Sequence, residues 1–274
     1  RSVCISQSCL NHFNADTPFR LLLRTVLFLR KKKMLYRKYR PQSFDAVKGQ
    51  DHIVAVLSAA LEKAQVGHAY LFTGPRGVGK TTCARILARA VNCEKSGGSD
   101  PCGECVTCRD FLSGRALDLI EVDAASTRGI DEMRDLREIA RLAPARARKK
   151  VFVLDEAHML TPQASNALLK TLEEPPEHVL FILATTDAQD ILPTIHSRCQ
   201  RFDFHPLGPL TVATHLKKIA AAEGIEIEDS AVALIAKAAR GAMRDAQMLM
   251  EQAAAYADGA VTAQQVRDLM GLVD

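Results

Sequence analysis

The 274-residue sequence contains no tryptophan, and aromatic residues make up only 5% of it. It also lacks an internal repeat and any apolar run of the roughly 20 residues that a membrane-spanning helix requires. These absences exclude a repeat array and a transmembrane helix. With 47% hydrophobic and 25% charged residues, the composition is that of an ordinary globular protein, which at this length buries a core without disulfides.

A strong charge of one sign is also lacking. The formal net charge is +4, but residues 1–33 carry seven basic side chains and one acidic one, which leaves 29 basic and 31 acidic side chains in the remainder. The body of the protein is therefore not a polycation. Any contact with nucleic acid has to come from a local patch.

The first 33 residues differ in character from the rest. RLLLRTVLFLRKKK is a short apolar run broken by arginines and followed by Lys31–Lys33, whereas a signal peptide places its charges before the apolar run. A transit peptide, or an arm that binds a membrane surface or nucleic acid, is an alternative. We favour sequence translated upstream of a true start at Met34, and we expect residues 1–35 to be a leader that is disordered or not native.

From Met34 on, short apolar runs alternate with helical patterns, an order typical of a three-layer α/β fold with a parallel sheet. Four buried strands and a fifth strand at the sheet edge are expected at 68–74, 117–125, 149–158, 178–186 and 198–204. Helices are expected at 51–67, 81–93, 130–144 and 161–176. Asp51 and Gly67 are the expected caps of the first of these helices, while Thr161 and Pro162 begin the last one.

Proline and glycine mark two irregular stretches: LYRKYRPQSFDAVKGQ at 35–50, which predicts an extended segment, and HPLGPL at 205–210, which predicts a hinge. Beyond the hinge the sequence is rich in alanine, a strong helix former. Helices are expected there at 211–224, at 228–259 with a break near Gly241, and at 262–273. The expected domains are an α/β domain at 36–206 and a small helical domain at 207–274.

GPRGVGKT, from Gly74 to Thr81, matches the phosphate-binding loop (P-loop) pattern G-x-x-x-x-G-K-[ST], with a predicted strand before it and a helix after it. Glycines let backbone N–H groups turn onto phosphate oxygens, and the helix N-terminus favours negative charge. Lys80 is expected to meet the β and γ phosphates, and the Thr81 hydroxyl to bind Mg²⁺. The expected ATP-binding residues of this loop are Gly74, Pro75, Arg76, Gly77, Val78, Gly79, Lys80, Thr81 and Thr82.

Two acidic residues follow the third predicted strand, in VFVLDEAH. Ligands of such sheets bind at the carboxyl ends of the strands, so Asp155 is expected to hold Mg²⁺ and Glu156 to orient or deprotonate the attacking water. Adjacent acids at a strand end are in isolation more often a solvated turn. Together with the P-loop they predict hydrolysis of ATP in addition to binding.

The motifs YRKYRPQSFDAVKGQ, AYLFTGPRGVGKTT, ALLKTLEEPPEHV, LATTD, SRCQRF and GAMRDA follow in an order that closely resembles the ATPase subunits of bacterial sliding-clamp loaders, the gamma/tau family of DNA polymerase III within the AAA+ class. The resemblance covers residues 36–274. It implies a AAA+ P-loop ATPase domain with a small cysteine insert, followed by a helical lid. It also implies that the family continues beyond residue 274 into a helical collar.

The resemblance assigns further residues to the ATP site. Thr185 takes the place of a polar residue that senses the γ-phosphate, and Arg198 that of an arginine finger offered to ATP on the neighbouring subunit. Arg244 takes the place of the lid arginine that contacts its own nucleotide. The wall of the adenine pocket is matched by Val47, Gly49 and Gln50. Without the resemblance, each arginine would be an ordinary surface residue.

Four cysteines are spaced C-x8-C-x2-C-x2-C at Cys93, Cys102, Cys105 and Cys108. A replication ATPase of the bacterial cytoplasm, as the resemblance implies, works where structural disulfides are rare, and this spacing suits a tetrahedral Zn²⁺ site without an open position for chemistry. The clamp-loader family places a zinc module here, at 93–108. An iron–sulfur cluster and an unmetallated thiol cluster remain alternatives. The site would order a surface insert and could offer a docking surface for another subunit.

The function implied is that of an ATP-driven motor subunit of the DNA polymerase III holoenzyme. Its expected partners are the other clamp-loader subunits in a hetero-pentameric ring, the sliding clamp, primer–template DNA without sequence preference and, in a longer form, the polymerase core; no membrane partner is expected. Lys170 and Arg128 are candidate DNA contacts, although each is more often a solvated residue. A nucleotide-gated scaffold with little turnover and another AAA+ DNA-processing motor are the alternatives.

Overall fold

The computed structural model describes residues 34–95, 98–127, 129–257 and 259–271. Within these residues, a five-stranded parallel sheet has the order β2-β3-β4-β1-β5. Its strands are β1 (Ala69–Thr73), β2 (Leu119–Asp123), β3 (Lys150–Asp155), β4 (Val179–Thr185) and β5 (Gln200–Asp203). All five lie where the sequence predicts them, and β5 is an edge strand as expected.

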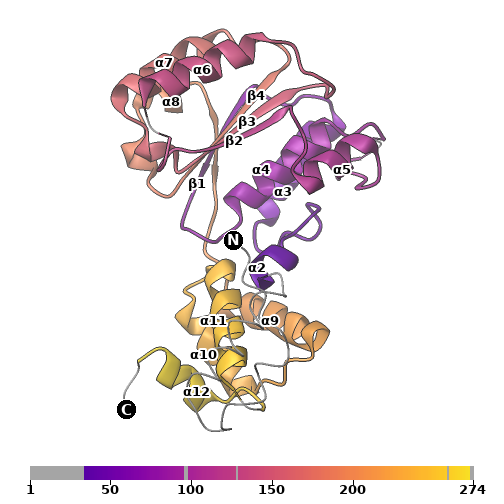
Figure 1. Ribbon diagram of the computed structural model, residues 1–274, viewed down its shortest axis with the longest axis vertical. Coiled ribbons are helices and arrows are strands. Elements are labelled where there is room, and N and C mark those ends of the chain that lie inside the picture. Colours follow the sequence, from indigo (N-terminus) through magenta and orange to yellow (C-terminus); the bar gives the residue numbers. More distant parts are fainter. Residues whose placement is uncertain (1–33, 96–97, 128, 258, 272–274) are drawn as a thin grey trace, which may run out of the picture.

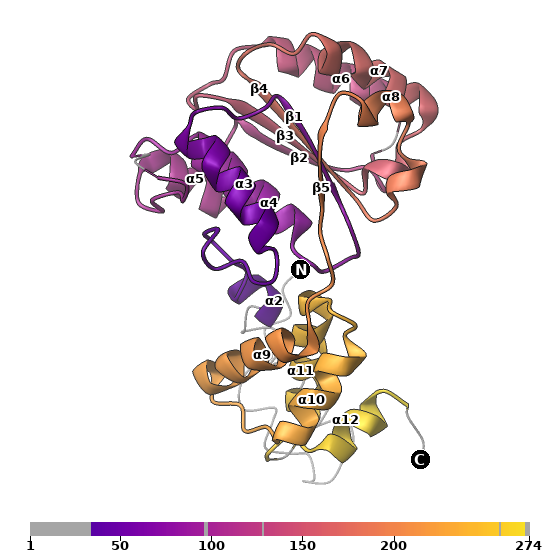
Figure 2. The ribbon, with the colours of Figure 1, turned by 180° about the vertical axis from the view of Figure 1, so that it is seen from behind.

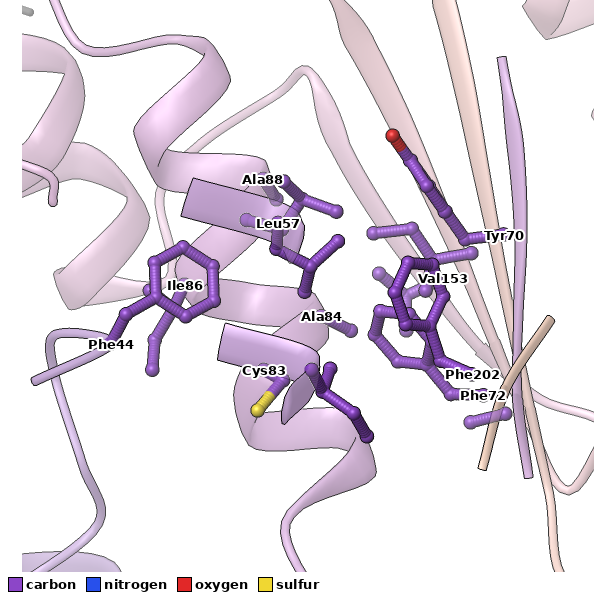
Figure 3. Packing of buried hydrophobic residues seen from close by; sticks show 14 of the residues in the cluster. Phe44, Leu57, Tyr70, Phe72, Cys83, Ala84, Ile86, Ala88, Val153 and Phe202 are labelled. Atoms are coloured by element: carbon purple, nitrogen blue, oxygen red, sulfur yellow. The ribbon is translucent and has the colours of Figure 1, made fainter. Parts of the chain in front are cut away.

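Helices cover both faces of the sheet, which confirms the three-layer arrangement (Figures 1 and 2). Alternate side chains of a strand enter opposite faces, so Tyr70 and Phe72 of β1 join one hydrophobic cluster and Leu71 joins another. The first cluster packs against α3 (Asp51–Glu62) and α4 (Lys80–Val91), as Figure 3 shows. The second packs against α6 (Ile130–Arg141) and α7 (Pro162–Glu173). The short helices α5 (Val106–Ser113) and α8 (Pro193–His196), with two 3₁₀ turns, η2 (Ala157–Met159) and η3 (Ala188–Asp190), complete this part.

The predicted start of α7 is confirmed, whereas both caps predicted for α3 are wrong. Asp51 is the first residue of α3, and Gln50 is its N-cap. Thr161 caps α7 by accepting a hydrogen bond from the backbone N–H of Ala164. Helix α3 ends at Glu62 instead of extending to Gly67, because Ala64 adopts a left-handed backbone (φ 53°) and Gln65 N–H bonds back to the Ala60 carbonyl. Gly67 does not end the helix, because Ala64 adopts the left-handed conformation in which glycine is usually found.

A bundle of helices follows β5 and has its own hydrophobic cluster. It consists of α9 (Pro209–Glu223), α10 (Asp229–Ala238), α11 (Met243–Tyr256) and α12 (Ala263–Leu269). The predicted break near Gly241 is confirmed, because Arg240 and Gly241 have φ angles of 48° and 84° and end the helical path. The separate cluster supports a domain boundary near residue 207, which stays a prediction.

The stretch at 35–50 begins with a helical turn, α2 (Leu35–Lys38), which packs against α11 of the bundle. Leu35 is buried among the bundle residues, and its backbone N–H donates to Glu251 Oε2 at 3.2 Å. The expectation that Leu35 is part of a disordered leader is therefore wrong, because its apolar side chain completes the bundle core. Residues 1–33 of that leader lie outside the described residues.

Candidate nucleotide site and cysteine cluster

The P-loop runs from the end of β1 to the start of α4. Its glycines Gly74, Gly77 and Gly79 have φ angles of 134°, 78° and 112°, a region that side chains disfavour. At Gly74 a Cβ would lie 2.3 Å from the Phe204 carbonyl oxygen, so only glycine fits this close approach. Within the loop, Val78 is buried, whereas Pro75 and Arg76 are exposed.

Lys80, the first residue of α4, folds back onto the P-loop. Its Nζ donates to the Gly74 carbonyl at 2.6 Å and to the Pro75 carbonyl at 2.8 Å. The side chain is buried, and burial lowers the pKa of Lys80, while the carboxylates of Glu156 and Asp155 oppose that shift. The ammonium group thus lies at the loop, close to the predicted Mg²⁺ ligand Asp155 and the predicted catalytic residue Glu156.

Thr81 and Asp155 join the P-loop to β3. The Thr81 hydroxyl donates to Asp155 Oδ2 at 2.8 Å, and Asp155 Oδ1 accepts from the Glu156 backbone N–H at 3.1 Å. The two oxygens come from elements 74 residues apart in the sequence. A hydroxyl oxygen and a carboxylate oxygen are the protein ligands that hold Mg²⁺ beside a nucleotide in P-loop proteins.

Glu156 has a left-handed backbone (φ 49°), which is strained for a residue with a side chain. This conformation places its Oε2 3.3 Å from the Thr186 hydroxyl and 3.6 Å from His158 Nδ1. His158 Nδ1 also lies 3.0 Å from the hydroxyl of Thr185, which is fully buried. The structure therefore links the predicted catalytic acid to the predicted γ-phosphate sensor.

His158 and Thr186 were missed by the sequence analysis. Both lie within two residues of a motif residue, but neither follows a spacing rule that would single it out. His158 contacts Thr185, and Thr186 contacts Glu156, because β3 and β4 are neighbours in the sheet, which only the folded chain shows.

Arg244 and Thr82 each contact the segment before α3. The Arg244 guanidinium lies 4.7 Å above the ring of Tyr36, and Thr82 Oγ1 accepts from Arg40 Nε at 3.0 Å. The helical bundle also reaches the P-loop, since a Cβ at Gly77 would lie 3.0 Å from Ala242 Cβ and 3.5 Å from Arg244 Cβ. The start of α11 is thus beside the P-loop, where a lid residue has to be.

The predicted adenine-pocket residues contact the hinge. Gln50 is fully buried. Its side-chain Nε2 donates to the His205 carbonyl at 2.7 Å, and its Oε1 accepts from the His205 backbone N–H at 3.2 Å. Gly49 lies against Leu207, where a Cβ would be 2.3 Å from Leu207 Cδ2. Val47 belongs to the core of the α/β part. These contacts connect the sheet to the bundle, and the adenine-pocket role stays a prediction.

Among the residues that the structure describes, Arg198 and Lys170 make no contact with the P-loop. Arg198 contacts Glu173 and Thr194, which belong to α7 and α8. Lys170 is exposed on α7, and Arg128 lies outside the described residues. Their roles remain predictions.

The four insert cysteines come together, with sulfur atoms all within 4.8 Å of one another. Backbone N–H groups point at the sulfurs, as in the contacts from Cys105 to Cys102 Sγ and from Cys108 to Cys105 Sγ, both at 3.3 Å. The N–H groups of Cys105 and Glu104 lower the pKa of the Cys102 thiol to about 6, whereas burial raises the pKa of Cys108. Four sulfur atoms at these separations are the donor set that fits Zn²⁺. The other two described cysteines, Cys83 and Cys199, are free, and burial raises both thiol pKa values to about 12.

Residues 49–208 match a family model described as "DNA polymerase III, delta subunit", and residues 211–259 match "DNA polymerase III clamp loader subunit, ATPase lid domain". The chain belongs to the clamp-loader ATPase family of DNA polymerase III. It is 50% identical over 222 residues to DNA polymerase III subunit tau of Bacillus subtilis, and 48% identical over 242 residues to the tau subunit of Escherichia coli. These alignments cover 81% and 88% of this chain but 39% and 38% of the relatives, so the chain spans well under half of their length.

The fold is also that of a AAA+ protein. The Thermotoga maritima RuvB Holliday junction branch migration motor superposes with a TM-score of 0.61 at 23% identity, over 85% of this chain and 72% of the other. This likeness concerns the fold, a parallel sheet with a helical lid. Membership of this ATPase family implies a nucleotide and Mg²⁺ at the site. In the described part of the chain, no helix combines the length and apolar character that crossing a membrane requires.

Proposed function

We propose that this chain is an ATP-binding and ATP-hydrolysing motor subunit of a DNA polymerase III clamp loader, which loads the sliding clamp onto primed DNA. The observation that carries the proposal is the Thr81–Asp155 hydrogen bond of 2.8 Å, because it brings the P-loop hydroxyl and a carboxylate from β3 to one point. Such a pair is used to hold the metal of a nucleotide in P-loop ATPases. Membership of the clamp-loader family supplies the biological setting.

The roles proposed for the site follow from its contacts. Backbone N–H groups of residues 74–82 would bind the phosphates, and Lys80 would exchange its two carbonyl acceptors for phosphate oxygens. Thr81 and Asp155 would hold Mg²⁺, which lowers the negative charge of the phosphates. Glu156 would accept a proton from the attacking water or orient it, with Thr185 and His158 close to the γ-phosphate position.

Completion of the site by a neighbouring subunit is also proposed. Arg198 contacts α7 and α8 of its own chain and none of the proposed phosphate-binding residues, which suits an arginine supplied to another protomer. Hydrolysis would then depend on ring assembly. The partners proposed are the other subunits of a hetero-pentameric ring, the clamp, primer–template DNA and, in the longer form, the polymerase core, in the bacterial cytoplasm.

The test compares the wild-type protein with Lys80→Ala and Glu156→Gln variants, in a complex reconstituted with its partner subunits, clamp and primed DNA. Lys80→Ala should abolish binding of ATP, whereas Glu156→Gln should bind ATP but lose turnover by about 10²-fold or more. Equal single-turnover rates for wild type and Glu156→Gln would instead support a scaffold with little turnover. Absence of ATP binding to the wild-type protein would refute the proposal.

A further inference from the structure

Residues 34–47, here called the N-terminal strap, contact three separate parts of the molecule. At the start of the strap, α2 packs on the helical bundle and lies between the bundle and the sheet in both views (Figures 1 and 2). In the middle, Arg40 contacts α4 just beyond the P-loop. Near its end, the strap meets the cysteine module at residues 93–108. One stretch of chain therefore connects the module, the proposed ATP site and the lid.

The module holds the strap through a carboxylate. Asp100, two residues before Cys102, accepts the backbone N–H of Phe44 at 2.5 Å and that of Asp45 at 3.5 Å. The Phe44 ring is 1% exposed and packs beside Ile86 in the core cluster (Figure 3). The ring and the carboxylate together fix the strap backbone at this position.

A second link comes from Arg89, in the last turn of α4 and four residues before Cys93. Its side chain is 4% exposed, and the guanidinium donates to both the side-chain oxygen and the backbone carbonyl of Gln42. A buried guanidinium has to be hydrogen-bonded, so these contacts are costly to break. Arg89 thus ties the strap to the helix that runs from the P-loop to the first cysteine.

These links determine where Arg40 lies. Arg40 is two residues from Gln42, and its Nε donates to Thr82 Oγ1 at 3.0 Å, next to the proposed Mg²⁺ ligand Thr81. Burial lowers the pKa of Arg40 to about 10, and Asp155 is among the carboxylates that oppose the shift. Its positive charge therefore stands beside the proposed phosphate site and is held there from the strap side.

We propose that the cysteine module is a positioning element of the ATP site, acting through Asp100 and Arg89 on the strap and, by way of the strap, on Arg40. The inference rests on the proposed function, because it assigns the module to the same ATP site. A strap released from the module would leave Arg40 mobile, and its side chain would have to be ordered again when nucleotide binds. Affinity for ATP should therefore depend on contacts that ATP does not touch.

The test uses the full chain and a fluorescent ATP analogue, and it compares two single carboxylate deletions in the module. Asp100→Ala should weaken binding by about tenfold while the zinc content stays unchanged. Amide hydrogen exchange should become faster at residues 42–45. The matched control is Glu104→Ala, since Glu104 is exposed in the same module and pairs with Lys95 instead of the strap; it should bind as wild type does.

A double-mutant cycle identifies the route. If the module acts through Arg40, Asp100→Ala and Arg40→Ala should weaken binding together by much less than the product of their separate effects. Wild-type affinity in Asp100→Ala, or fully multiplicative effects, would overturn the inference while the ATP site itself stands. If Asp100→Ala loses zinc, Gln42→Ala replaces it in the test, because Gln42 lies outside the module. Its affinity for the analogue and its coupling with Arg40→Ala then support or overturn the inference in the same way. A wild-type chain that bound no analogue would instead refute the proposed function.

Discussion

Arg198 Nη2 lies 2.6 Å from Glu173 Oε1, so the proposed arginine finger is paired within its own chain. The Nη1 atom also donates to the Thr194 carbonyl at 2.8 Å. With side-chain exposures of 32% and 45%, the ion pair is largely solvated and contributes at most about 1 kcal/mol. A phosphate on a neighbouring subunit could therefore replace Glu173 at small cost.

Arg198→Ala should lower ATP turnover of the assembled complex by about 10³-fold, as expected when an arginine in trans is removed. The affinity of the isolated chain for ATP should not change, because Arg198 contacts none of its own proposed ATP-binding residues. Steady-state turnover and equilibrium binding measure the two effects. Arg201→Ala is the control, since Arg201 pairs with Asp203 on β5 and should be dispensable. Undiminished turnover in a fully assembled Arg198→Ala complex would contradict the trans role.

Zinc should be present at one ion per purified chain. Cys105→Ser should lose it, because Cys105 supplies both a sulfur of the cluster and the N-terminal cap of α5. If the free energy of unfolding falls by about 3 kcal/mol in Cys105→Ser, the thermal midpoint should fall by roughly 6–12 °C. Metal analysis and thermal unfolding check both statements, with Cys199→Ser as a control that keeps its zinc. Iron in place of zinc, or full metal content in Cys105→Ser, would show the assignment to be wrong.

Gly74→Ala should destabilise the protein more than Gly114→Ala does. Both glycines have positive φ, and that strain alone costs about 1–2 kcal/mol in alanine. At Gly74 the new Cβ would also meet the Phe204 carbonyl at 2.3 Å, whereas nothing lies within 4 Å at Gly114. Urea unfolding of the two variants measures the difference, and only Gly74→Ala should lose ATP binding. Equal destabilisation would mean that the loop can move away from Phe204.

Asp118 should make stability depend on acid pH. Burial by itself raises the pKa of Asp118, but N–H groups of Ala147, Ala145 and Arg146, at 2.7–2.9 Å, outweigh it and hold the pKa below its usual value. The stabilisation is therefore complete above the unfolded-state pKa of about 4 and is lost as the pH falls through the folded-state pKa.

Asp118→Asn should cost about 2 kcal/mol at pH 7, and its difference from the wild type should shrink below about pH 4. Urea unfolding at several pH values measures this. Asp229→Asn, at an exposed surface pair with Lys217, should stay close to wild type throughout. A difference that grew toward acid pH would contradict the assigned direction of the pKa shift.

The strands, most helix starts and the position of the P-loop could all be predicted from local patterns along the chain. Strand β3 and Asp155 at its end could be predicted because burial of an apolar run and the position of acids after it are local properties. Helix α3 shows the limit of such signals, since the left-handed position that ends it is taken by Ala64 and leaves no glycine at that point.

Contacts between residues far apart in the sequence follow from the way the elements pack in three dimensions. His158 reaches Thr185 because β3 and β4 are adjacent in the sheet, and Asp100 reaches Phe44 because the cysteine module folds back beside α4. Leu35 belongs to the bundle core although it lies 171 positions before Pro206 in the hinge. Periodicity and spacing describe neighbours along the chain, whereas these contacts depend on the order in which strands and helices pack, and on long-range burial that a local pattern does not encode.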